Sequence, residues 1–246
     1  MKKKLLAGCI ALAAGIGAGQ ASAATYGATA DTGVYQFLGN MYPFGVVDTL
    51  FALHSDAGHS FNTVLDFNTL DSALSTLTAG NYTATLNLYV VPPTAELTQG
   101  FANGISPVDH PMTIDILAKN GAWTETGAIT WASTLGGANL GSFTVDSLGW
   151  ISVDITSIVA AWATAGSTGD GIVLNNTDQA FYRDPDTGLL PILAFNAKET
   201  DFSPYIDIQA VNDVSETPLP AALPLFATGL GALGVIAHRR KRKQAA

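Results

Sequence analysis

Tyr182 and Arg183 are the residues whose types and setting best suit ligand binding in this 246-residue sequence. They lie in segment 180–184, which has the character of a loop, and binding residues concentrate on loops. Aromatic rings can stack on sugar rings because they offer large, rigid faces. The tryptophans offer similar faces, but they occupy strand or helix positions that suit core packing, so a core role is favoured for each. The four tryptophans are Trp123, Trp131, Trp150 and Trp162.

Oxygen ligands for a metal ion are concentrated in one stretch of the sequence. Calcium prefers such oxygens, and the donors here are Asp178, Asp184, Asp186, Asn175 and Asn176. Their spacing is not that of an EF-hand, so a structural Ca²⁺ is one reading and a chance grouping on an acidic surface is the other. The histidines at 54, 59 and 110 lack metal-binding spacing and are expected in solvated loops.

No sequence motif requires catalysis. Glycosidases place two carboxyl groups about 5–10 Å apart, but with 20 acidic residues some pair meets that distance by chance. A Gly-x-Ser-x-Gly elbow and a phosphate loop are both missing from the sequence. We therefore predict no catalytic residue and no enzyme. The alternative is a polysaccharide lyase or hydrolase that uses loop carboxylates or Tyr182 with Arg183.

The charge distribution excludes nucleic acid as a partner. All 20 acidic residues lie between Ala24 and Glu216, where the basic residues are Lys119, Arg183 and Lys198, so this part carries a net charge of −17. Nucleic-acid binding needs Lys and Arg to displace phosphate counterions. The same charge disfavours attraction to acidic polysaccharides and attracts divalent cations. Cys9, the single cysteine, lies near the N-terminus, so the remainder has no thiol and no disulfide.

Alternation of apolar and polar residues with period two predicts short β-strands that are buried on one face. The predicted strands are 84–90, 114–116, 151–155 and 206–208, with further strands near 49–53, 63–67, 128–131, 142–145, 171–175 and 192–196. Only 157–164 has helical spacing, with Asp154 or Thr156 as a cap. Residues 24–211 are thus predicted to be an all-β domain, a two-sheet antiparallel sandwich of jelly-roll-like form with one short helix. Residues 212–216 form a linker.

The N-terminus has the three parts of a secretory signal. Three lysines at 2–4 precede an uncharged segment over 5–19, and Ala21 and Ala23 form a small-x-small cleavage site. We expect signal peptidase to cut after Ala23, which defines residues 1–23 as a signal peptide. Two alternatives are a retained membrane anchor and a lipoprotein box ending at Cys9.

The C-terminus combines an uncharged span with a basic end. Residues 217–237 carry no charge, and basic residues fill 238–243. A run of this length can span a bilayer as a helix with its Lys and Arg on the cytoplasmic side. That orientation agrees with a domain exported by the signal peptide. A simple permanent anchor is one reading of this tail.

The tail over 217–246 resembles PEP-CTERM sorting signals in their "VPLPA" variant. The motif is Thr217-Pro218-Leu219-Pro220-Ala221, with Thr217 where that variant usually has Val. The resemblance implies that an exosortase-type membrane protease recognises the motif and removes the tail. It also implies a Gram-negative host that makes exopolysaccharide.

The order of strand motifs resembles the disaggregatase-related (DNRLRE) domain, a β-sandwich of carbohydrate-binding-module type. The matching segments are 30–32, 44–50, 63–67, 84–90, 122–131, 149–162 and 195–206. One departure is an absent Arg near Asn62 and Thr63, which makes basic contacts to an acidic glycan unexpected. The resemblance implies a non-catalytic protein of the cell envelope, cell surface or biofilm matrix that associates with exopolysaccharide, and that is held transiently in the inner membrane by its tail.

Overall fold

Antiparallel β-strands are the main regular secondary structure in a computed structural model that describes residues 23–37, 40–43, 47–54, 59–92, 106–127, 129–177 and 192–211. The strands are β1 (Ala24–Gly27), β2 (Ala30–Phe37), β3 (Asn40–Pro43), β4 (Thr49–His54), β5 (His59–Asp66), β6 (Tyr82–Val91), β7 (Met112–Ala118), β8 (Asn139–Val145), β9 (Gly149–Asp154), β10 (Ile172–Asn176), β11 (Leu193–Asn196) and β12 (Tyr205–Ala210). The predicted all-β class is confirmed.

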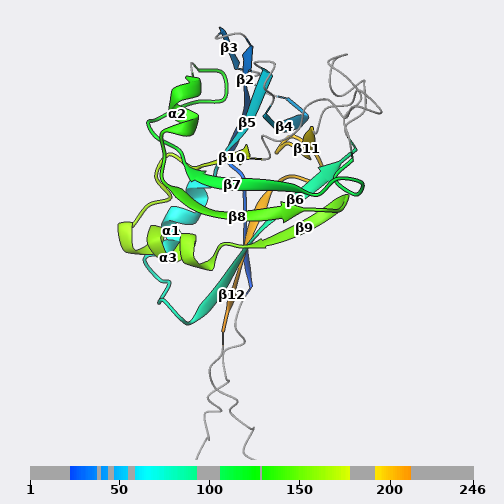
Figure 1. Ribbon diagram of the computed structural model, residues 1–246. Coiled ribbons are helices and arrows are strands. Elements are labelled where there is room, and N and C mark those ends of the chain that lie inside the picture. Colours follow the sequence, from blue (N-terminus) through cyan, green and yellow to red (C-terminus); the bar gives the residue numbers. More distant parts are fainter. Residues whose placement is uncertain are drawn as a thin grey trace, which may run out of the picture. The chain divides into compact units, whose positions relative to one another are not determined.

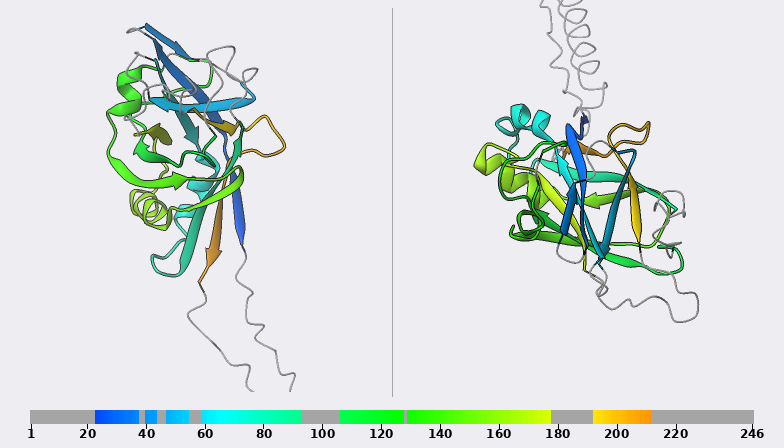
Figure 2. Two further views of the ribbon diagram at one scale, coloured as in Figure 1. Left: turned by 45° about the vertical axis from the view of Figure 1, so that its right-hand side comes forward. Right: turned by 90° about the horizontal axis from the view of Figure 1, so that it is seen from above.

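The sheet is continuous in its hydrogen bonding. Its order is β1-β12-β6-β11-β4-β5-β10-β7-β8, while β9 also pairs with β6 and β2 pairs with β5 and β3. Strand β4 joins the two halves because it pairs with β11 at Ala52 and with β5 at Leu53. In Figure 1, β7 and β8 run across the direction of β1 and β12, and Figure 2 shows the sheet from two further sides.

The main core is formed by the inward-facing side chains of both halves. Leu86 and Leu88 of β6 belong to the same buried cluster as Ile114 of β7, Leu174 of β10 and Phe195 of β11. Full burial of one such side chain stabilises the fold by about 1.5–3 kcal/mol. The period-two alternation of the sequence therefore reflects strands with one face against this core.

Helix α3 (Thr156–Ala165) confirms the predicted helix over 157–164. Its side chains Ile158, Val159 and Trp162 are buried. The carboxylate of Asp154 accepts a hydrogen bond of 2.9 Å from the Thr156 amide, and this bond lowers the pKa of Asp154. The described residues also include a 3₁₀ turn (Asn68–Leu70) and the short helices α1 (Asp71–Leu74) and α2 (Trp131–Leu135).

The strand predicted over 128–131 is wrong. The Thr130 side chain accepts a hydrogen bond from the Ser133 amide and caps helix α2, which begins at Trp131. A capped helix start satisfies amides that a strand would pair in a ladder. Strands β1, β2 and β3 were not predicted, because their segments lack clear alternation.

The described unit begins and ends on neighbouring strands. Strand β1 pairs with β12 so that Ala24 lies opposite Ile208. The predicted signal peptide up to residue 22 and the linker and sorting tail from 212 onward lie outside the described residues. Within the part that the structure describes, no helix is long and apolar enough to cross a membrane.

Candidate functional site

The outer face of β12, β6 and β9 is the first candidate site. Because side chains alternate along a strand, the inward position of Leu86 and Leu88 leaves Asn87 and Tyr89 on the opposite face of β6. The register places Tyr89 directly opposite Trp150 of β9. It also places Asn87 between Ser152 of β9 and Tyr205 of β12. Three strands thus present their outward side chains side by side.

Four aromatic rings gather on this face, and we refer to Tyr89, Trp150, Phe202 and Tyr205 as the aromatic face. Tyr89 stacks on Phe202 with a centroid distance of 4.4 Å and an interplanar angle of 20°. Trp150 meets Tyr89 edge to face at 5.4 Å and Tyr205 at 5.3 Å. Phe202 comes from the connection between β11 and β12, so this connection completes the group.

The aromatic face is open to solvent. Trp150 is 45% exposed and Phe202 is 43% exposed, which is unusual for two large apolar side chains that touch the same neighbours. The prediction that Trp150 packs in the core is therefore wrong. It is confirmed for Trp162, which is 8% exposed, while Trp123 and Trp131 are partly buried against a smaller cluster around Val173.

Polar groups lie beside the aromatic rings on the same strands. The Ser152 hydroxyl donates to the Asn87 side-chain oxygen at 2.6 Å. Further along β12, the Gln209 amide donates to Asp207 at 2.8 Å. A sugar offers an apolar C–H face and a rim of hydroxyls, so rings next to fixed polar groups can contact both parts.

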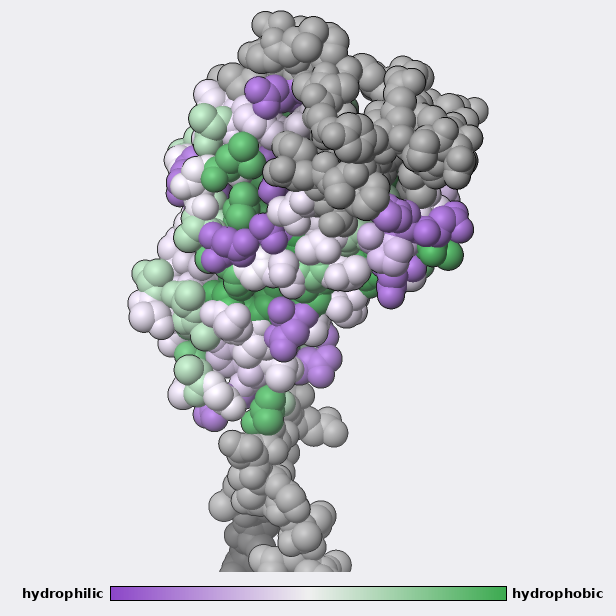
Figure 3. Space-filling view, viewed as in Figure 1, coloured by the Kyte–Doolittle hydropathy of each residue, from purple (hydrophilic) through white to green (hydrophobic). Residues whose placement is uncertain are grey.

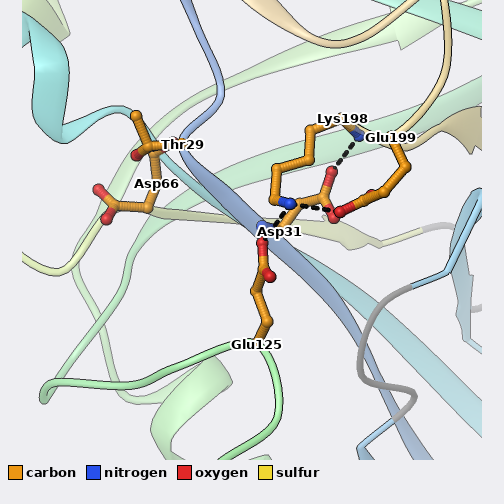
Figure 4. A network of polar contacts seen from close by, with 6 residues as sticks. All are labelled: Thr29, Asp31, Asp66, Glu125, Lys198 and Glu199. Carbon is orange, nitrogen blue, oxygen red and sulfur yellow. Dashed lines mark hydrogen bonds and ion pairs between the residues drawn. The ribbon is translucent and has the colours of Figure 1, made fainter.

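A second candidate site is an ionic group that we call the carboxylate cluster: Asp31, Glu125 and Glu199, with Lys198 between them (Figure 4). Asp31 lies in β2, Glu125 lies between β7 and α2, and Glu199 follows β11. The Lys198 ammonium lies 2.8 Å from Glu125 Oε1 and forms a second ion pair with Glu199. The Lys198 amide donates to Asp31 Oδ2 at 2.5 Å, and the Asp31 amide donates to Glu125 Oε1 at 3.2 Å.

The surroundings of the carboxylate cluster raise the pKa of both Asp31 and Lys198. Burial, which removes water from the charged form, raises the pKa of Asp31 to about 7, with a smaller upward contribution from the charges of Glu199 and Glu125. The hydrogen bond from the Lys198 amide opposes this shift. Hydrogen bonds to Glu125 and Glu199 raise the pKa of Lys198. Lys198 therefore remains charged over the physiological pH range.

The carboxylate cluster was not predicted from the sequence, because its hydrogen bonds join residues 94 and 167 positions apart. The sequence did contain a pattern that could have pointed to these residues. All three carboxylates lie within segments that carry the DNRLRE resemblance, namely 30–32, 122–131 and 195–206.

Both lysines of the described part are committed to internal contacts. Lys198 belongs to the carboxylate cluster, and the Lys119 ammonium donates to the carbonyls of Asn120 and Gly121 at 2.6 and 2.9 Å. Figure 3 shows hydrophilic residues in several separate places on the face in view. Within the described residues, no lysine is left to offset the acidic surface.

Most of the residues predicted as ligands cannot be placed. Tyr182, Arg183, Asp178, Asp184, Asp186 and the sorting motif 217–221 lie outside the described residues, and Ala23 is the first residue described. Asn175 and Asn176 lie in β10, where they pair with β7, and Asn176 is buried. His110 lies in the turn before β7. The expectation of a loop position is wrong for His54, which ends β4, and for His59, which begins β5; the structure does not describe the side chains of these two. The predicted calcium site therefore stays a prediction, because three of its five ligands lie outside the described residues.

No protein-family model matches this sequence, and no curated protein gives a significant match. The likeness to the DNRLRE domain and to PEP-CTERM tails therefore rests on the motifs alone.

Proposed function

We propose that this protein is a non-catalytic, exported surface or extracellular-matrix protein that associates with exopolysaccharide through a carbohydrate-binding-like, jelly-roll-type β-sandwich. The observation that carries the proposal is the aromatic face. Solvent-exposed rings that touch one another on the outer face of the sheet, with Asn87 and Ser152 beside them, suit stacking on sugar rings. The ligand class is a neutral glycan, because the net charge of −17 over 24–216 repels acidic chains.

The C-terminal tail of the proposal follows the last strand of the domain. Tyr205 begins β12 and Ala210 ends it, and the tail follows that end. In this proposal the domain is held by its tail until an exosortase-type protease removes it.

An enzyme that cleaves polysaccharide is the alternative. A general acid must reach the glycosidic oxygen, and Asp31, whose pKa of about 7 would suit that role, is 0% exposed. Asp31 is thus inaccessible as a general acid, while Tyr182 and Arg183 of this alternative lie outside the described residues. Purified protein that released reducing ends or unsaturated sugars from the host's exopolysaccharide would support the enzyme instead.

The test is retention of the full chain, purified in mild detergent, in affinity electrophoresis with neutral glycans and with the host's own exopolysaccharide. We expect wild type to be retarded and Trp150→Ala to lose about fivefold or more in affinity, because one stacked ring contributes about 1 kcal/mol or more. Leu135→Ala, which truncates a side chain that is 44% exposed away from these strands, is the matched control. Equal retardation of wild type and Trp150→Ala, or no retardation on any glycan, would refute the proposal.

A further inference from the structure

The carboxylate cluster has the spacing of a cation site. One oxygen from each of Asp31, Glu125 and Glu199 lies within 4.8 Å of the other two. Oxygens bound to one Ca²⁺ at 2.3–2.6 Å can be separated by up to about 5 Å. The three side chains can thus meet one calcium ion with little movement.

Asp31 supplies an independent sign of a ligand. Its side chain is 0% exposed, and its Oδ1 atom has no hydrogen-bond partner, while Oδ2 accepts from the Lys198 amide. In Figure 4 the Asp31 carboxylate points toward Glu199 and the Lys198 side chain. A buried carboxylate oxygen without a partner is costly, so Oδ1 is an acceptor available to a cation.

The positive charge within the carboxylate cluster does not balance the negative charge of its three carboxylates. A single ammonium faces three carboxylates, and its two ion pairs are with Glu125 and Glu199 rather than with Asp31. The Lys198 side chain is 21% exposed, and its long, flexible stem lets the ammonium move into solvent. Lys198 can therefore give up its place to an ion of higher charge.

We propose that Asp31, Glu125 and Glu199 form a divalent-cation site that takes Ca²⁺ in exchange for the Lys198 ammonium. Calcium is favoured over magnesium because Mg²⁺ needs ligands at 2.0–2.1 Å in strict octahedral geometry, whereas these oxygens are spread more widely. Solvent completes the coordination on the side of the partly exposed Glu199. The ion would join β2, the β7–α2 connection and the β11–β12 connection, and the proposal is independent of glycan binding.

The experiment is calorimetric titration of the full chain in detergent with CaCl₂ and, separately, MgCl₂, together with thermal unfolding in Ca²⁺ or EGTA. We expect one calcium per chain, an increase in the unfolding temperature with Ca²⁺ and a weaker response to Mg²⁺. Glu125→Gln and Glu199→Gln should each lower calcium affinity about tenfold or more, because affinity follows the number of charged ligands. Asp146→Asn, which alters an exposed acid between β8 and β9, should bind as wild type does.

A lysine variant separates a cation site from a salt-bridge network. Lys198→Met keeps the length of the stem and removes the competing ammonium, so we expect lower stability in EGTA, tighter calcium binding and recovery of stability with Ca²⁺. If the cluster is only a salt-bridge network, Lys198→Met will be destabilised equally with and without calcium. That result, or the lack of a calcium response in both wild type and Lys198→Met at millimolar Ca²⁺, would overturn the proposal.

Discussion

At the scale of single residues, the environment rather than the residue type decides the role. Trp150 and Trp162 both lie in segments that suit core packing, yet Trp162 is buried in α3 and Trp150 stands open on β9. The side chain of Trp150 falls on the outward face because it alternates with Ile151, which packs against the main core. Trp162 is buried and Trp150 is exposed because they lie on different faces of their elements relative to the core.

Asp31 makes stability depend on pH in a direction unusual for a carboxylate. Its pKa is about 7 in the folded protein and about 3.9 in an unfolded chain. Between these values the folded state binds one more proton than the unfolded state. The free energy of unfolding should therefore fall as pH rises from 4 to 7, by up to about 1.4 kcal/mol per pH unit from this group.

Urea denaturation in EGTA at several pH values measures this slope. In Asp31→Asn, the uncharged amide mimics the protonated acid, so the pH dependence that Asp31 adds to the free energy of unfolding should disappear. At pH 7 without calcium, this variant should be more stable than wild type. Parallel pH profiles for wild type and Asp31→Asn would contradict the assignment.

At the scale of elements, the close approach of β5 to the start of β10 limits which residue can precede β10. Gly171 precedes β10 with φ +91°, and a Cβ atom there would lie 2.2 Å from the Leu65 carbonyl oxygen of β5. Gly169 also has a positive φ, +70°, but a Cβ atom there would meet nothing within 4 Å. The two glycines share a backbone conformation and differ in their surroundings.

Alanine at these two positions should separate the cost of a positive φ from the cost of the clash with Leu65. Gly169→Ala should cost about 1–2 kcal/mol for the positive φ alone. Gly171→Ala should cost at least about twice as much, because the clash with Leu65 forces β10 away from β5. Chemical denaturation of both variants provides the comparison, and equal losses would show that β5 and β10 separate at little cost.

At the scale of the whole molecule, the pairing of β1 with β12 brings the two ends of the domain together. Ala24 lies opposite Ile208, so a signal peptide before Ala24 and a tail after Val211 would leave from neighbouring strands. Cleavage at either end would then not require any strand to leave the core. This arrangement is compatible with the proposed processing by signal peptidase and an exosortase-type protease.

Mass spectrometry of the protein from native cells and culture medium tests this processing. We expect a mature N-terminus at Ala24 and loss of peptides beyond Ala221. Tail peptides that persist in the mature pool would point to a permanent anchor, and a retained N-terminal peptide in a cytosolic fraction would end the export model.

Local pattern alone predicted the β class, most strands and helix α3, because alternation and helical spacing record which side of each element faces the core. It also supported expectations for both termini and for an acidic, cysteine-free domain, since these depend on composition and order. It misassigned 128–131, where the Thr130 cap outweighs strand propensity. Trp150 was assigned to the core although the alternation puts it on the same face as Ser152 and Asp154. Only the tertiary structure brought Asp31, Glu125 and Glu199 within 4.8 Å of one another and placed Trp150 beside Phe202. Contacts between distant segments depend on which strands pair, and period-two alternation fixes the face that a strand turns to the core but not the strand beside it.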